Sequence, residues 1–150
     1  MPGIDISVTI GATPTEVWSV VEDVAGHVEW MADATEIRFL TDERSGVGVR
    51  FECDTKVGPL TTTDVMEITE WEPEQSMGVR HSGAVTGEGR FELEAVEPDH
   101  TIFRWSEDLS FPWYFGGPLG EFAAKPVLEW VWRRNLTRLA GIVEERFPRA

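Results

Sequence analysis

Two side chains, His81 and Glu107, could transfer protons inside a pocket. His81 shares alternate positions with Met77 and Val79, so in a strand these three side chains point to one face. An imidazole titrates near neutral pH and could serve as acid or base in an aldol-type cyclisation or a dehydration. The alternative interpretation is a hydrogen-bonded histidine at the end of a strand, and both stay open at this stage.

Glu107 places a carboxylate among apolar residues on one strand face, because it follows Phe103 and Trp105 at alternate positions. Burying a carboxylate is costly unless it is paired or its pKa is raised. The pattern therefore predicts either a functional acid in a pocket or a salt bridge, with Arg104 or Arg134 as the partner.

The other reactive residue types carry weaker signals. Cys53 is the single cysteine and has no basic neighbour in sequence, so we expect an inert buried thiol. Asp64 repeats the pattern of Glu107 more weakly, and His27 and His100 are expected at the surface. No His or Cys pair has metal-ligand spacing, and the glycine-rich segment lacks the context of a phosphate loop, so no metal or other cofactor is expected.

The composition is that of an acidic, aromatic-rich protein. Its 150 residues carry 13 Lys+Arg against 27 Asp+Glu, a formal net charge of -14. Such charge repels polyanions, so neither nucleic acid nor an anionic membrane is expected as a partner. The sequence shows no signal peptide and no apolar run long enough for a membrane span, and we predict one cytoplasmic domain over residues 1–150.

A sheet must position the two candidate residues. Alternating apolar and polar residues predict seven strands, over residues 4–10, 35–41, 47–57, 61–71, 77–81, 89–96 and 101–111. Short, turn-rich segments separate the last six strands, which is typical of an antiparallel meander.

Helices are predicted in two places. Thr13, Pro14 and Glu16 form a capping-box pattern that opens a short helix after the first strand, and a second short helix is expected over residues 27–32. Three-and-four spacing of apolar residues predicts one long helix over residues 119–147, with a start or a kink at Pro126.

This order of elements predicts an α+β helix-grip fold, a seven-stranded curved antiparallel sheet wrapped around a long C-terminal helix. A twisted sheet approaches one helix closely along one line only, which leaves an apolar gap elsewhere. Aromatic residues are expected to line that gap. The candidates are Trp30, Phe51, Phe91, Phe103, Trp105, Trp113, Tyr114, Phe115 and Trp130. The segment 111–118 could form a lid, a core plug or a homodimer interface.

The residues from Ala12 to Asp23, Ala-Thr-Pro-Thr-Glu-Val-Trp-Ser-Val-Val-Glu-Asp, resemble the opening of the START/Bet v 1-like (SRPBCC) superfamily. More narrowly they are similar to the polyketide cyclase/dehydrase and lipid-transport family, in which a tryptophan follows in the next helix, as Trp30 does here. The similarity extends to a strand that ends in a proline turn at Pro73 and to the closing helix. It implies the helix-grip fold, but members of such a fold include both carriers and enzymes.

Three functions fit these observations. The first is binding of a small hydrophobic or aromatic, polyketide- or lipid-like molecule in the gap between sheet and helix. The second is a cyclase or dehydratase that uses His81 or Glu107 as acid or base, with Arg104 or Tyr114 orienting a carbonyl. The third is a partner-binding domain with a filled core that acts through the loop around Trp113. Binding is the favoured function, because the sequence does not require that any two residues act as a catalytic acid–base pair.

Overall fold

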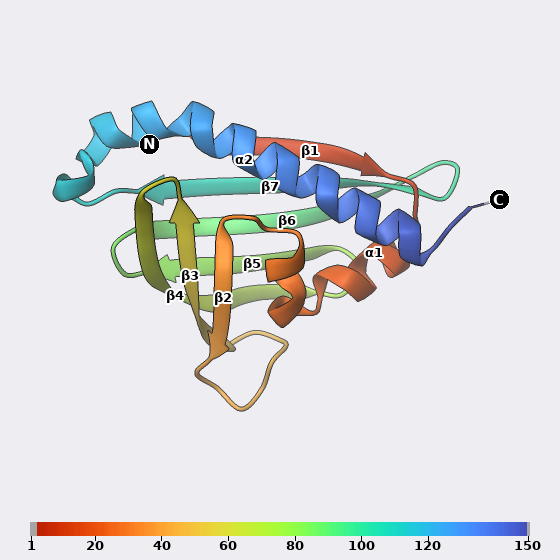
Figure 1. Cartoon of the computed structure of the whole chain (residues 1–150). Coiled ribbons are helices and arrows are strands. Elements are labelled where there is room, and N and C mark those ends of the chain that lie inside the picture. The colour runs from red at the N-terminus through yellow and green to blue at the C-terminus, as the bar shows by residue number, and fades with distance from the viewer. Residues whose placement is uncertain (1–2, 150) are drawn as a thin grey trace.

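All seven strands belong to one antiparallel sheet, in which neighbours in sequence pair from the second strand to the seventh (Figure 1). The computed structural model describes residues 3–149. The strands are β1 (Ile4–Ile10), β2 (Ala34–Phe39), β3 (Arg50–Val57), β4 (Leu60–Glu72), β5 (Ser76–Ser82), β6 (Thr86–Val96) and β7 (His100–Ser110). Strand β1 pairs with β7, so β1 and β2 form the two edges of the sheet.

Four helical segments accompany the sheet: α1 (Pro14–Val21), the 3-10 turns η1 (Val24–Glu29) and η2 (Trp113–Phe115), and α2 (Gly117–Arg146). The capping box of α1 forms as predicted, with Thr13 and Glu16 each accepting a hydrogen bond from the backbone of the other. This arrangement satisfies amides that would otherwise lack a partner at the helix start.

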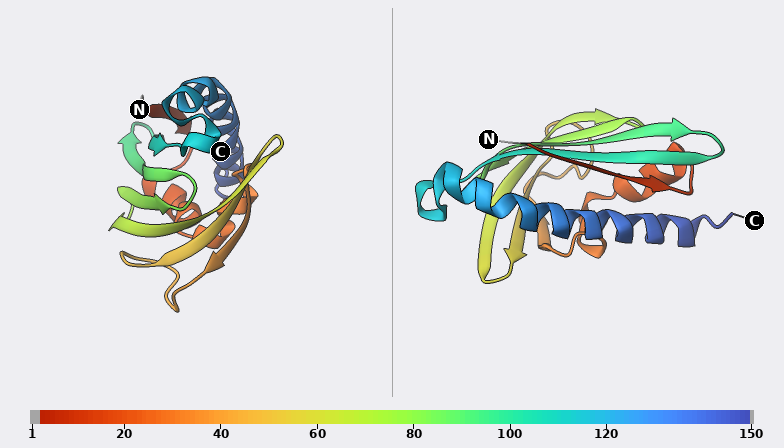
Figure 2. Two further views of the ribbon diagram at one scale, coloured as in Figure 1. Left: turned by 90° about the vertical axis from the view of Figure 1, so that its left-hand side faces the viewer. Right: turned by 90° about the horizontal axis from the view of Figure 1, so that it is seen from above.

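Helix α2 runs along β1, and the sheet curves around it (Figures 1 and 2). In the left view of Figure 2 the β3–β4 hairpin bends round towards the helix. The buried residues of α2 lie mainly in its C-terminal half. They include Trp132, Asn135, Leu136, Leu139, Ala140 and Val143. The predicted helix-grip fold is therefore confirmed, with the tight contact at one end of the helix and a looser contact at the other.

Four predicted boundaries are wrong. Strand β6 begins three residues earlier than predicted. The second short helix is the earlier 3-10 segment η1, because Asp23 caps it by accepting a hydrogen bond from Gly26 N. Strand β3 begins three residues later than predicted, because Gly46 and Gly48 adopt left-handed φ angles of 97° and 95° that interrupt the extended chain. Helix α2 starts before Pro126 and continues through it, so this proline does not begin the helix.

An aromatic cluster forms the core between η1 and the sheet. The ring of Trp30 lies 5.8 Å from that of Phe91 and 6.3 Å from that of Phe103. Such tilted and edge-to-face pairs add to the stabilisation that comes from buried area. Within residues 3–149, no helix combines the length and the apolarity that crossing a membrane requires.

His27 was expected at the surface and is instead buried, with 6% of its surface exposed. Its ring packs 5.2 Å from Trp30, and Nε2 lies 2.7 Å from the carbonyl oxygen of Val21. The expectation is wrong because the turn of η1 directs the residue inward, which sequence spacing alone does not reveal. Burial lowers the pKa of His27 to about 4.

The burial of His27 predicts an acid-sensitive fold. The unfolded chain protonates this residue near pH 6.5, whereas the folded protein keeps it neutral down to about pH 4. Because the unfolded state then holds the extra proton, His27 should lower the free energy of unfolding by up to about 3 kcal/mol as pH falls through this window. Urea denaturation of the wild type and of His27→Gln at several pH values measures this contribution.

In that comparison the wild type should lose more stability on acidification than His27→Gln does. The variant His100→Gln, which changes the histidine at the start of β7, should follow the wild type. Equal acid sensitivity of His27→Gln and the wild type would contradict the prediction.

Candidate functional site

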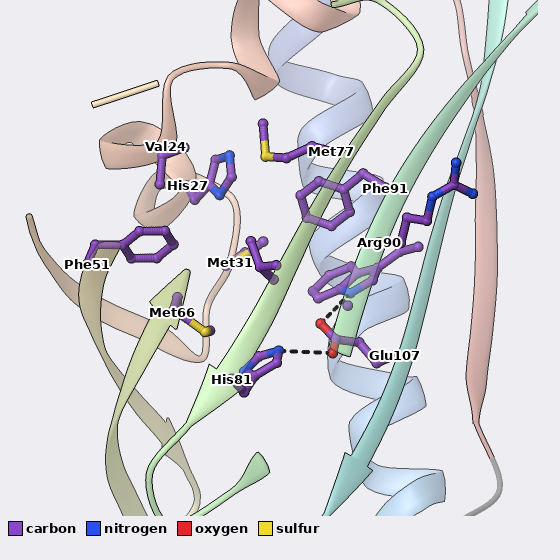
Figure 3. A pocket seen from close by; sticks show the side chains of 13 residues that line it. Val24, His27, Met31, Phe51, Met66, Met77, His81, Arg90, Phe91 and Glu107 are labelled. Atoms are coloured by element: carbon purple, nitrogen blue, oxygen red, sulfur yellow. Dashed lines mark hydrogen bonds and ion pairs between the residues drawn. The ribbon is translucent and has the colours of Figure 1, made fainter. Parts of the chain in front are cut away.

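His81 on β5 and Glu107 on β7 meet across β6, with 3.1 Å between Nε2 and Oε2 (Figure 3). Both side chains are buried, with 10% and 7% of their surface exposed. Gly89 of β6 lies opposite Glu107 in the strand register. A Cβ atom at position 89 would lie only 2.7 Å from Oε2 of Glu107, so the missing side chain of Gly89 leaves the carboxylate room to cross β6.

Trp105 is a second hydrogen-bond donor to the carboxylate of Glu107. The indole Nε1–H of Trp105 donates to Oε1 of Glu107 over 3.0 Å. The Trp105 ring stacks on Trp132 of α2, with ring centroids 4.8 Å apart and planes at 17°. Trp132 and Asn135 in turn donate hydrogen bonds to the two carboxylate oxygens of Asp33, over 3.0 and 2.7 Å. The His81–Glu107 pair is thus connected to the long helix through the stacked indoles of Trp105 and Trp132.

The environment of His81 favours the imidazolium. Burial opposes protonation, but the hydrogen bond to Glu107 and the charges of Glu107 and Asp64 outweigh it and raise the pKa of His81 above its usual value. Asp64 lies nearby on β4 and is 5% exposed. Burial raises the pKa of the Asp64 carboxyl above its usual range.

A cavity of about 450 Å³ lies between the first half of α2 and the β3–β4 hairpin. Most of its lining is apolar. The apolar residues are Val57, Pro59, Leu60, Met66, Val85, Trp105, Leu109, Phe111, Phe115, Ala124, Val127, Leu128 and Trp132. His81 and Glu107 belong to its wall, together with Asp33 and Asp64. A smaller hollow of about 60 Å³, drawn in Figure 3, shares His81, Glu107, Met66 and Trp105 with it.

The predicted aromatic lining divides into three groups. Phe51, Phe91 and Trp105 line the small hollow, and Trp105 and Phe115 line the larger cavity. Trp30 and Phe103 are 1% and 0% exposed and belong to the core beneath these hollows rather than to their walls.

Trp113, Tyr114 and Trp130 form the third group, because the structure places them away from the cavity. They are 86%, 57% and 61% exposed. The turn η2 directs Trp113 and Tyr114 outward, so these two side chains do not plug the core. Trp130 points away from the sheet, and the guanidinium of Arg134 lies over its ring. A homodimer contact through this exposed group stays a prediction.

The salt bridge proposed for Glu107 has a different partner from the two arginines that were expected. Arg104 is an odd number of residues away, on the opposite face of β7, and lies 3.8 Å from Asp5. The guanidinium of Arg134 lies over the ring of Trp130, on the outer side of α2. The carboxylate binds His81 instead, which lies on the same face of the sheet.

Sequence reasoning missed Asp33, Trp132 and Asn135 as residues of the site. Asn135 interrupts the apolar stripe of the long helix, and a buried amide on such a stripe usually has a hydrogen-bond partner. That interruption was the available signal. Its partner could not be named, because Asp33 lies 102 residues earlier in the chain.

Cys53, the single cysteine of the chain, is buried on β3. Burial raises the pKa of the Cys53 thiol to about 11, which keeps it protonated at neutral pH. Between residues 3 and 149, no three His, Cys, Asp or Glu side chains are grouped so as to hold a metal ion.

Comparisons with solved structures identify the same fold elsewhere. The chain is similar to the Zhui aromatase/cyclase from Streptomyces sp. R1128, with 20% identity, coverage of 97% of this chain and 94% of that one, and a TM-score of 0.75. A START superfamily protein from Mycobacterium smegmatis has 14% identity over 95% of this chain and 97% of its own, with a TM-score of 0.79. TTHA0849 from Thermus thermophilus has 17% identity, coverage of 97% and 99%, and a TM-score of 0.79.

At these identities the structural matches establish the fold alone. Among curated proteins, no sequence matches the chain. The family model described as polyketide cyclase / dehydrase and lipid transport matches residues 1–146. The resemblance noted in the first helix therefore extends over nearly the whole sequence, and the chain belongs to the polyketide cyclase/dehydrase and lipid-transport family.

Proposed function

We propose that this protein binds a small, largely apolar molecule in the cavity between α2 and the β3–β4 hairpin. The observation that supports this most directly is the cavity itself, which measures about 450 Å³ and has a mainly apolar wall. Ligand sites in proteins commonly enclose roughly 300–1,000 Å³ and combine apolar lining with a few polar groups. Here the polar groups are His81, Glu107, Asp33 and Asp64.

The position of the cavity supports the same proposal. Helix α2 is held to the rest of the protein near Trp132 and Asn135, whereas Val127 and Leu128 in its earlier part border the cavity. Val127 is 50% exposed, so this side of the cavity lies close to solvent. A ligand could enter there without disturbing the core around Trp30.

A second candidate function is a cyclase or dehydratase, and the paired His81 and Glu107 favour it. The imidazolium of His81, which Glu107 stabilises, would give its proton to a hydroxyl of the substrate, which leaves as water. The neutral imidazole would then remove a proton from the adjacent carbon, next to the substrate carbonyl, which yields the double bond and restores the imidazolium. Trp105 would act as a positioning residue, because its indole N–H holds the Glu107 carboxylate. The related Zhui protein bears the name aromatase/cyclase, which agrees with this chemistry.

Filling the cavity tests the binding proposal. We expect Leu128→Trp to abolish the thermal stabilisation that aromatic polyketide-like compounds give the wild type, because the larger ring occupies the ligand volume. The matched control is Leu119→Trp, at a position on α2 that is 77% exposed and outside the lining. A thermal-shift screen measures both. Undiminished stabilisation of folded Leu128→Trp would place the ligand elsewhere.

The space above Gly89 gives a test of the acid–base pair. We expect Gly89→Ala to displace the Glu107 carboxylate, so that burial dominates and the pKa of His81 falls. NMR titration of the His81 imidazole measures this change. Gly141→Ala is the control, because nothing lies within 4 Å of a Cβ atom there. An unchanged pKa of His81 in Gly89→Ala would contradict the argument.

Measurements of turnover distinguish a catalytic function from ligand binding alone. With a compound that the wild type converts, His81→Ala should lower kcat by about 10²–10⁴-fold, the usual contribution of general acid–base catalysis, and should leave binding largely intact. Glu107→Gln should lower kcat less, because the imidazole is still present. Steady-state kinetics and calorimetric titration distinguish these effects. If His81→Ala retains wild-type turnover, the acid–base role is excluded.

A further inference from the structure

The cavity wall carries three buried carboxylates and a single basic side chain. Asp33, Asp64 and Glu107 are 9%, 5% and 7% exposed, and all three line the cavity. His81 is the basic group, and among the described residues of the lining there is neither lysine nor arginine. When His81 is protonated, it is hydrogen-bonded to Glu107 and its charge also acts on Asp64, so one cation faces three carboxylates.

The three carboxylates differ in how well the protein satisfies them. Asp33 accepts two hydrogen bonds from side chains of α2, over 3.0 and 2.7 Å. Glu107 is bonded by Trp105 over 3.0 Å and paired with His81 at 3.1 Å. Asp64 accepts two long hydrogen bonds, each of 3.4 Å, from the Thr62 hydroxyl and from the backbone N–H of Val85, and the backbone amide of Ala84 also stabilises the carboxylate. A buried carboxylate ordinarily has shorter charge-assisted bonds of about 2.7–2.9 Å.

We propose that the ligand of this cavity carries a protonated amine beside its apolar body, and that Asp64 is the carboxylate that binds it. The inference rests on the proposed function, since it names the chemical class of molecule that the same cavity holds. An ammonium group offers three donors and a positive charge to a carboxylate whose present hydrogen bonds are long. The desolvation of Asp64 already occurs on folding, so binding adds only the desolvation of the ligand's own charge.

The same charges disfavour other ligands of similar shape. A fatty acid or another apolar anion would bring a further negative charge into a wall that already holds three carboxylates. A neutral alcohol could donate one hydrogen bond to Asp64 but would leave its charge unbalanced. The cavity should therefore rank matched molecules in the order amine, alcohol, acid.

Calorimetric titration at pH 7 with aminomethyl anthracene, hydroxymethyl anthracene and anthracene carboxylate tests this order on one shared ring system. We expect the amine to bind the wild type at least about tenfold more tightly than the alcohol, and the acid to bind more weakly than the alcohol. Asp64→Asn should reduce the affinity for the amine to that for the alcohol and leave the alcohol affinity unchanged.

Asp108→Asn is the matched control, because it removes the same charge from an exposed position on β7. It should keep the preference for the amine, which separates a local effect of Asp64 from the general field of an acidic protein. Binding of the alcohol together with an equal or tighter affinity for the acid would overturn this inference alone. An intact amine preference in Asp64→Asn would also overturn it. Failure of all three compounds to bind the folded protein would contradict the proposed function as well.

Discussion

The buried carboxylate of Asp33 links the long helix to the sheet, and the geometry of the site depends on this link. Asp33 follows η1 and precedes β2, and it accepts hydrogen bonds from Trp132 and Asn135 of α2. Asn135 also accepts a hydrogen bond from the backbone N–H of Ala32. Its side chain therefore binds two consecutive residues of the segment between η1 and β2. Because the helix is held at this point, its earlier part spans the open end of the sheet and encloses the cavity rather than collapsing into it.

The contacts of Trp132 also connect Asp33 to the His81–Glu107 pair. Trp132 stacks on Trp105, and Trp105 holds the carboxylate that binds His81. A displacement of α2 would therefore alter the orientation of Glu107 as well as the shape of the cavity. Buried polar networks of this kind are costly unless every member is satisfied, and they define one arrangement when they are. Asp64 is the least satisfied carboxylate of the cavity wall, which is why we assign it a role in ligand binding.

Part of the site could be predicted from strand alternation. The alternation of side chains placed His81 and Glu107 on inward faces, because residues two apart share one face of any strand. It could not predict that the two would meet, since their distance depends on the register of β5, β6 and β7 and on the absence of a side chain at Gly89. Arg104 and Arg134 were the partners expected for Glu107 from the sequence pattern. Arg104 lies on the opposite face of β7, and Arg134 lies on the outer side of α2.

The sequence by itself determined the seven strands, the capped first helix and the long closing helix, because alternation, capping and three-and-four spacing are local properties of the chain. These local properties, with the family resemblance, were sufficient for the fold. Only the tertiary structure decided which polar groups become buried neighbours. In the folded protein His27 is buried and Trp113 is exposed. Asp33 accepts a hydrogen bond from a helix that lies about a hundred residues later in the chain. Such contacts join distant segments, and their free energy depends on the desolvation and geometry of the assembled protein rather than on residue type or spacing.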